Sequence, residues 1–185
     1  MGKLRELLFI FARFFGTYGM MLFLYQTYLE KYKPLAFNVD PFSVLVSKQI
    51  SFILNLIGIE NTLVYFKKLH GIAIYIKQIN TYPAYINEGC NAISVMIIFV
   101  AFLLTFYANF IKTSLYIFFG LCFIHLTNLF RIVLLDIIFL YFPAYAKFSH
   151  DIIFPIIIYG AVVLLWIGWI FYTQPINLKS SEQAH

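Results

Sequence analysis

Long apolar runs separated by short polar stretches form the dominant pattern of this chain. A helix needs ~20 mostly apolar residues to cross a lipid bilayer, and runs of about this length lie at 7–29, 92–111, 113–138 and 152–172. A shorter run at 42–59 is interrupted by polar residues, which predicts an interfacial or re-entrant helix. The pattern therefore predicts an all-α polytopic membrane protein, built on a small transmembrane helical bundle.

The chain changes to an alternating pattern ahead of the second long run. Apolar residues at Ile72, Ile74 and Ile76 follow a glycine-containing turn and the short run 64–66. Alternation around such a turn predicts a β-hairpin. We expect this short hairpin to lie on the extracytoplasmic side.

The first long run is preceded by basic residues, Lys3 and Arg5, as a secretory signal would be. It is longer than the ~7–15 apolar residues of a signal peptide, and no small-residue cleavage site follows it. The run 7–29 is therefore predicted to be a retained first helix that starts on the cytoplasmic side.

Lys112 separates the second and third long runs. It leaves room only for a tight turn, which predicts that the two helices are antiparallel neighbours. If Lys112 is cytoplasmic, then Cys90, Arg131 and His150 all lie at the opposite, extracytoplasmic face.

Composition excludes an ordinary soluble domain, because 62% of the 185 residues are hydrophobic and 11% are charged. The net charge of +5 does not predict nucleic-acid binding, since Lys67-Lys68 is the only basic pair and no basic stripe lies outside the runs. Membrane lipid is the expected surrounding. No repeat or second domain is visible, so residues 1–185 are expected to form a single membrane-embedded domain.

Cys90 is the first candidate for chemistry. It stands in a polar patch with Asn87 and Glu88, directly before an apolar helix. The unpaired N–H groups and the positive dipole end of a helix favour the thiolate, which is the nucleophilic form of cysteine. Glu88 has the opposite effect, so activation needs Arg131 or a protonated His150 nearby. The alternative is a buried structural cysteine.

Arg131 lies in the otherwise apolar run 113–138. A guanidinium costs at least ~2.5 kcal/mol near the bilayer centre and less near the interface, which suggests a function. It cannot act as a base, but it can stabilise a thiolate or an oxyanion. Asn128, three residues earlier, can orient it or donate a hydrogen bond. The alternatives are that Arg131 snorkels to lipid headgroups or pairs with Asp136.

His150 ends a predicted loop, 141–150, and begins the last helix. An imidazole titrates near neutrality, so it can take and return the proton that thiol acylation moves. Asp151 is interpreted as an N-cap. His125 lies deep in its helix and is expected to be a hydrogen-bonded bundle residue.

The remaining histidines and cysteines do not combine into a site. His70 and His185 have no cluster of ligands around them, so neither a metal nor another cofactor is predicted. Cys122 lies nine residues before Arg131 and hence ~14 Å deeper in the membrane, whereas the Cα atoms of bridged cysteines lie within ~7 Å. No disulfide with Cys90 is expected.

Three short motifs follow one another in a fixed order: Glu-Gly-Cys90-Asn-Ala-Ile-Ser94 at a helix start, Asn128-Leu-Phe-Arg131 on the next helix, and His150 at the start of the last. In this order they resemble the exosortase/archaeosortase family, most closely its short XrtF-type members. The resemblance covers chiefly residues 82–172. Many relatives have Gly two residues after the cysteine, where this chain has Ala92.

The resemblance implies a membrane-embedded cysteine peptidase or transpeptidase at the outer face of the bacterial inner (cytoplasmic) membrane. In that enzyme Cys90 is the nucleophile, His150 the acid and base, and Arg131 the stabiliser of the oxyanion or thiolate. The supporting residues are Asn128, Ser94 and Glu88. The partners that the resemblance implies are secreted proteins with a C-terminal sorting signal, made of a short motif, a hydrophobic helix and a basic tail.

Two other classes of protein stay open. A noncatalytic scaffold or partner in envelope or exopolysaccharide assembly would use Arg131 and His150 to contact lipid or protein. A small transporter is the other class, although no broken-helix pair or inverted repeat is evident in the sequence.

Overall fold

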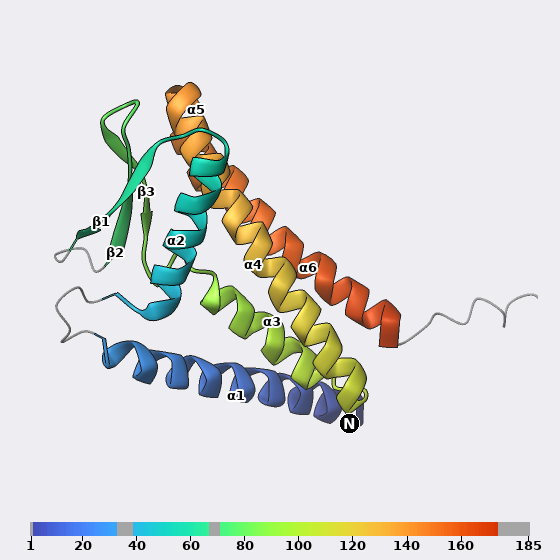
Figure 1. The fold of residues 1–185 in the computed structure, drawn as a ribbon. Helices are drawn as coiled ribbons and strands as arrows, with labels where there is room; N and C mark the ends of the chain where they lie inside the picture. The colour runs from blue at the N-terminus through green and yellow to red at the C-terminus, as the bar shows by residue number, and fades with distance from the viewer. Residues whose placement is uncertain (1, 33–38, 67–70, 174–185) are drawn as a thin grey trace, which may run out of the picture.

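The computed structural model describes residues 2–32, 39–66 and 71–173 (Figure 1). Within them the chain is mostly helical, with a small antiparallel sheet between the second and third helices. The helices are α1 (Gly2–Glu30), α2 (Pro41–Leu56), α3 (Ile93–Thr105), α4 (Phe110–Tyr141), α5 (Pro143–Phe148) and α6 (Phe154–Thr173). The strands are β1 (Asn61–Phe66), β2 (Gly71–Ile76) and β3 (Thr81–Ile86). A π-helical turn, Ser149–Ile153, joins α5 to α6.

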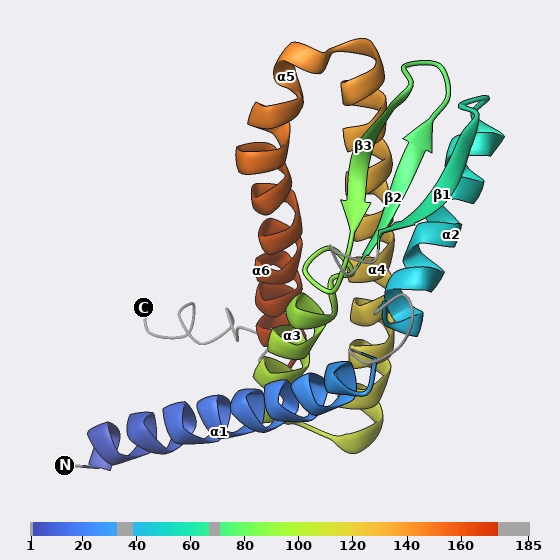
Figure 2. The ribbon, with the colours of Figure 1, turned by 90° about the vertical axis from the view of Figure 1, so that its left-hand side faces the viewer.

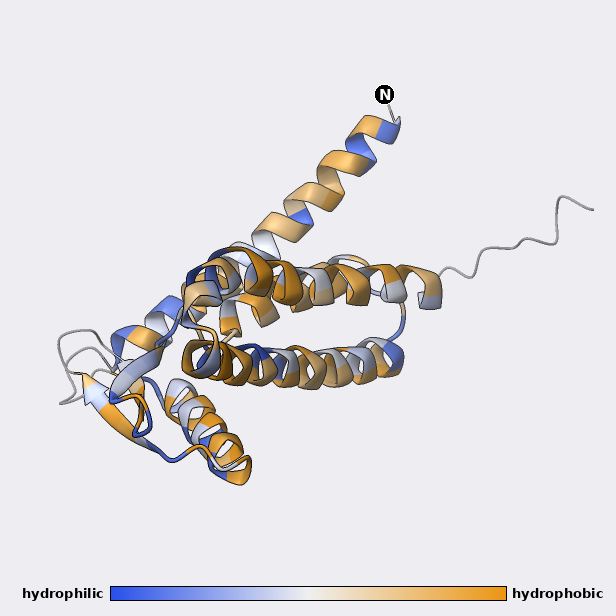
Figure 3. Ribbon diagram, turned by 90° about the horizontal axis from the view of Figure 1, so that it is seen from above, coloured by the Kyte–Doolittle hydropathy of each residue, from blue (hydrophilic) through white to orange (hydrophobic). Residues whose placement is uncertain are grey.

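Three helical stretches in the described part of the chain are long and apolar enough to cross a membrane. They are α1, α4 and the continuous helix from Pro143 to Thr173. The predicted spans 7–29, 113–138 and 152–172 fall within these stretches. Hydrophobic residues lie all round the helices (Figure 3), and many large apolar side chains are exposed, as expected for helices that face lipid. The three helices indicate a multi-pass membrane protein.

The remaining predicted span, 92–111, is not one helix in the structure. α3 has only 13 residues, which rise ~20 Å and do not cross a hydrocarbon layer of ~30 Å. The helix is interrupted because the side chain of Asn109 accepts a 3.0 Å hydrogen bond from the N–H of Ile111 and caps the start of α4. Lys112 therefore lies in the first turn of α4 and not in the connection. α3 and α4 run in opposite directions, as expected (Figure 1).

α2 occupies the segment 42–59 that was predicted to be interfacial or re-entrant. Asp40 caps it by accepting 3.0 Å hydrogen bonds from the N–H groups of Phe42 and Ser43. Gly58, at φ +82°, supplies the left-handed conformation just past the end of the helix. With 16 residues, α2 is too short for a span, and its position relative to a membrane stays a prediction.

The sheet has the order β1-β2-β3, so β3 is an edge strand. β1 and β2 form the predicted hairpin, with Leu63 opposite Ile74. The turn of this hairpin, with His70, lies outside the described residues. The sequence pattern does not predict β3, because Pro83 interrupts it. A proline is tolerated in a strand where the ladder does not need its N–H, as at a sheet edge.

Buried side chains form two clusters that meet along α4. The first cluster joins α2, the sheet and the C-terminal half of α4, and includes Val46, Ile50, Ile74, Ile86 and Ile132. The second cluster joins α3, α6 and the N-terminal half of α4, and includes Phe99, Leu103, Ile124, Ile158 and Trp169. α1 packs against α3 and crosses the α4–α6 pair at a steep angle (Figure 2). None of its described residues is buried.

Candidate active site

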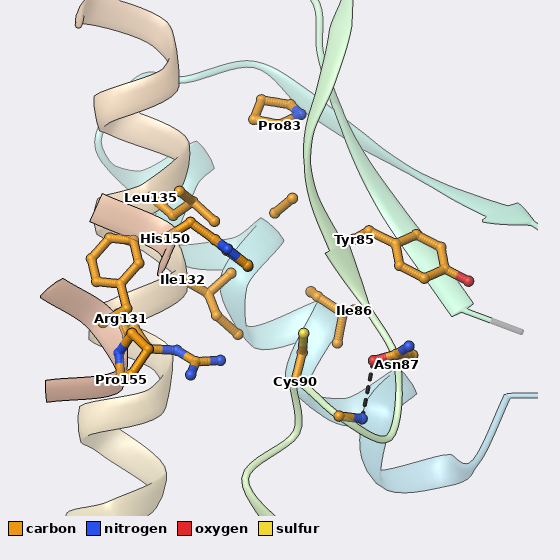
Figure 4. A pocket seen from close by; sticks show the side chains of 13 residues that line it. Pro83, Tyr85, Ile86, Asn87, Cys90, Arg131, Ile132, Leu135, His150 and Pro155 are labelled. Atoms are coloured by element: carbon orange, nitrogen blue, oxygen red, sulfur yellow. Dashed lines mark hydrogen bonds between the residues drawn. The ribbon is translucent and has the colours of Figure 1, made fainter. Parts of the chain in front are cut away.

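Cys90, Arg131 and His150 line one cavity of about 500 Å³ (Figure 4). The cavity lies between β3 and the turn after it on one side, and α4, the π-helical turn and the start of α6 on the other. The thiol, the guanidinium and the imidazole all point into this space (Figure 4). Elements that are far apart in the sequence thus bring the three residues to one place.

Cys90 lies on one wall of the cavity, and Arg131 and His150 lie on the opposite wall. Among the described residues, no hydrogen bond joins the sulfur of Cys90 to Arg131 or His150. A volume of about 500 Å³ is within the ~300–1,000 Å³ of typical ligand sites. The space between the groups can therefore hold part of a substrate.

The backbone of Cys90 is held on both sides. Its N–H donates to the carbonyl of Asn87 over 2.9 Å, and its carbonyl accepts from the side-chain amide of Asn128 over 2.9 Å. Asn128 is 1% exposed, so water does not compete for this hydrogen bond. The expected hydrogen-bond donor on α4 thus fixes the peptide group of Cys90, and no hydrogen bond joins it to Arg131 in the described part of the chain.

Asn91, the residue after Cys90, ties the turn to two distant helices. Its buried amide donates to Ser43 Oγ on α2 over 3.0 Å and to Tyr25 Oη on α1 over 3.3 Å. Its Oδ1 accepts a 3.0 Å hydrogen bond from the N–H of Ile93, the first residue of α3. One of the helix N–H groups expected to face Cys90 is therefore occupied. Sequence reasoning missed this role, because the partners lie 48 and 66 residues away.

Ala92, which joins this turn to α3, has a left-handed backbone with φ +65°. Ala92→Gly is expected to leave the free energy of unfolding nearly unchanged. Glycine removes a left-handed strain of ~1–2 kcal/mol, which offsets the ~0.4–1 kcal/mol of extra entropy that it gives the unfolded chain and the ~0.8 kcal/mol lost with the buried methyl group of Ala92. Unfolding of the purified protein in detergent measures the change.

The matched control for this prediction is Ala12→Gly. Ala12 lies in α1, is exposed and has no positive φ, so the same substitution is expected to destabilise the helix by ~1 kcal/mol. A loss of stability in both variants would contradict the strain at Ala92.

Arg131 is half-buried on α4, and its guanidinium extends towards Cys90 (Figure 4). It interacts electrostatically with Cys90 and Tyr159. The alternative partner, Asp136, is fully buried, and neither of its carboxyl oxygens has a hydrogen-bond partner among the described residues. Arg131 is therefore not paired with Asp136. It is positioned to act on a negative charge at the sulfur or next to it.

His150 lies in the π-helical turn and is exposed. The predicted loop 141–150 is mostly helical, because Pro143 occupies the first helical position of α5. Nδ1 of His150 donates to Oδ1 of Asp151 over 2.9 Å, since a carboxylate only accepts. Asp151 therefore orients the imidazole and does not cap a helix. Nε2 is left to exchange a proton in the cavity.

Two predicted supporting residues, Glu88 and Ser94, are exposed and do not line the cavity. Glu88 still contributes to the electrostatics beside β3. Burial raises the pKa of Tyr85, and electrostatic interactions with Glu88 and Cys90 raise this pKa further. The structure thus leaves Glu88 and Ser94 outside the group that surrounds the cavity.

The other histidines and cysteines lie away from the cavity or outside the described residues. Nε2 of His125 is 2.9 Å from Oε1 of Gln49, as expected of a bundle residue. His185 lies outside the described ranges. Both Cys90 and Cys122 are free thiols. Within the part of the chain that the structure describes, no three His, Cys, Asp or Glu residues group so as to hold a metal ion.

The cavity lies about one membrane thickness from the far ends of α4 and α6. Arg131 is 21 positions after Phe110, the first residue of α4, which corresponds to a rise of ~32 Å. α6 begins beside the cavity at Phe154 and has 20 residues, a rise of ~30 Å. A hydrocarbon layer is ~30 Å thick. If the two helices cross it, the cavity lies at its edge.

No protein-family model matches the chain, and no curated protein or solved structure matches it either. What the protein does must therefore be inferred from the cavity, from the residues that line it and from the order of the motifs in the sequence.

Proposed function

We propose that the protein is an exosortase-like cysteine peptidase or transpeptidase. The observation that carries the proposal is the meeting of a thiol, a guanidinium and an imidazole in one cavity of about 500 Å³. A cysteine with a nearby base and an oxyanion stabiliser is suited to acyl transfer. The left-handed backbone at Ala92 also supports the family resemblance, since many relatives have glycine there and glycine adopts this conformation without strain.

In the proposed reaction, Nε2 of His150 accepts the thiol proton of Cys90, and the sulfur attacks the carbonyl carbon of a peptide bond. The carbonyl oxygen becomes an oxyanion, which Arg131 stabilises. The C–N bond then breaks, the leaving amine takes the proton from His150, and the acyl group stays on Cys90 as a thioester. Water or an amine attacks the thioester, passes a proton through His150 to the departing sulfur, and releases the product.

Three further residues position these groups. Asn128 and Asn91 hold the turn that presents Cys90. Asp151 holds the imidazole of His150 by its Nδ1, so that the other nitrogen is available for proton transfer. None of the three takes part in bond making or breaking in this proposal.

We assign the cavity to the extracytoplasmic face. Lys112 lies over the ring of Tyr172 at 5.8 Å from its centroid, so the first turn of α4 and the last turn of α6 are at the same end of the pair. Lysine and tyrosine are typical of a membrane interface, and lysine favours the cytoplasmic side. Lys3 and Arg5 ahead of the first apolar run favour the same side. The cavity, at the opposite end of α4, then faces outwards.

Substrates of the proposed enzyme are secreted proteins with a C-terminal motif, a hydrophobic helix and a basic tail. In cells that contain the protein, such surface proteins are expected to lose this tail. In cells that lack the protein, the surface proteins are expected to keep the tail. Intact-mass spectrometry of the surface proteins measures the difference. If the tail is removed equally with and without the correctly inserted protein, the peptidase proposal fails and a noncatalytic scaffold is the better explanation.

A further inference from the structure

β3 has an open side that faces the candidate site. Among the described strands only β2 pairs with it, and β3 is the strand of the sheet nearest to α6 (Figure 2). Residues 83–87 and the turn after them line the cavity, across from Arg131 and His150. The cavity is therefore bounded by a sheet edge on one side and by the two candidate catalytic groups on the other.

Pro83 lies where the pairing of β3 with β2 is irregular. Ala84 lies opposite Ile74 and Thr81 lies opposite Ile76, so the register shifts between these two pairs. A proline has no N–H and is found at sheet edges and at bulges, where the ladder does not need one. Pro83 also lines the cavity, so this part of the edge strand borders the candidate site.

We propose that the substrate binds as an extended polypeptide that adds a strand to the open edge of β3 and presents its scissile bond to Cys90. This inference rests on the proposed function and specifies how its substrate is held. Edge strands readily accept another strand, and main-chain hydrogen bonds then provide affinity while side chains at alternate positions provide specificity. The ligand is thus a polypeptide in extended form, which excludes a folded helix at the cleavage point.

The path from the edge to the nucleophile is short. β3 ends at Ile86, and Cys90 follows after a turn that its own N–H closes on Asn87. A strand rises ~3.3 Å per residue, so three residues of substrate beside β3 cover ~10 Å. The opposite wall carries the apolar side chains of Leu135 and Phe154, which favours an apolar substrate side chain close to the scissile bond.

The test uses the full-length protein in detergent and valine peptides that carry a chloromethyl ketone, which alkylates a thiol. Extending the peptide from one valine to three is expected to raise the second-order rate of Cys90 alkylation about tenfold, because two backbone hydrogen bonds are added. Two isomers of the longest peptide are then N-methylated at neighbouring amides. The isomer whose methyl group faces β3 is expected to lose the increase in alkylation rate. The other isomer is expected to keep it, since only alternate amides of the peptide face the edge of the sheet.

Equal rates for the two N-methylated isomers, or no gain with length, would overturn strand addition. Iodoacetamide, which has no peptide part, separates this failure from a failure of the proposed function. If Cys90 reacts with iodoacetamide faster than Cys122 does, but its alkylation rate does not rise with peptide length, the proposed thiol chemistry is retained and the strand-addition inference is wrong. If Cys90 reacts no faster than Cys122 with either class of reagent, the proposed function fails, and the inference fails with it.

Discussion

Cys90→Ser is expected to slow the trimming of a tailed surface protein by at least ~10⁴-fold, because removal of the nucleophile leaves only substrate binding and electrostatics. A hydroxyl at this position is a much weaker nucleophile than a thiolate. The peptide of Cys90 keeps its hydrogen bonds to Asn87 and Asn128, so insertion and folding are expected to be unchanged. Pulse labelling followed by intact-mass analysis measures the trimming rate, and thermal unfolding checks the fold.

The other cysteine of the chain supplies the matched control. Cys122 lies on α4, is exposed and does not line the cavity, so Cys122→Ser is expected to trim at the wild-type rate. Wild-type trimming by a correctly inserted Cys90→Ser protein would show that the thiol is not the nucleophile. A scaffold in envelope assembly would then be the preferred function.

The long helices could be predicted from the sequence because an apolar run of ~20 residues has few other stable arrangements. α1, α4 and α6 all cover such runs. The break between α3 and α4 could not be located in the same way, since it depends on one short side chain, Asn109, inside a continuous apolar stretch. A hydropathy pattern does not reveal a helix cap, so the connection was predicted at Lys112 instead.

β3 was missed for a different reason. Its residues pair with β2, and the local pattern around Pro83 does not show the alternation that reveals a strand. A strand that is defined by a distant partner is recognised only when the partner is known. The missed strand matters, because it forms one wall of the candidate site.

The candidate site, like the fold, could be predicted only in part from the sequence. Cys90, Arg131 and His150 could be selected from the sequence, because each is a reactive or charged residue within or next to an apolar run. The contacts that hold the cysteine turn could not be selected, since Asn91 reaches α1 and α2, and Asn128 reaches back across 38 residues. Residue types indicate which side chains can react, whereas the positions of these side chains depend on contacts that form only in the folded protein.

The site lies where the two buried clusters meet. Cys90 packs against the cluster of α2, the sheet and α4, whereas Ala92, two residues later, belongs to the cluster of α3, α4 and α6. A turn that is fixed from both sides can hold a nucleophile in one orientation, which is what acyl transfer requires. This location also explains why a strained Ala92 backbone is tolerated, because the packing around it determines the path of the chain.

Arg131 gives the second large effect. Arg131→Gln is expected to slow trimming by about 10²–10³-fold, the loss typical of removing one donor to a developing oxyanion. Arg131→Lys keeps the charge but lacks the planar fork of donors, so its rate is expected to lie between those of the wild type and the glutamine variant. Lys112→Gln removes a cation from the same helix ~28 Å away and is expected to have no effect on the rate.

Alkylation of Cys90 by iodoacetamide separates the two roles that a guanidinium can have. If Arg131 stabilises the thiolate, Arg131→Gln slows alkylation as well as trimming, because the thiolate is the reacting form. If Arg131 acts only on the oxyanion, alkylation keeps its wild-type rate while trimming falls. The orientation of the guanidinium towards Cys90 favours an effect on both rates. Wild-type rates in both measurements would remove Arg131 from the mechanism, and its burial on α4 would then need another explanation, such as a contact with lipid headgroups.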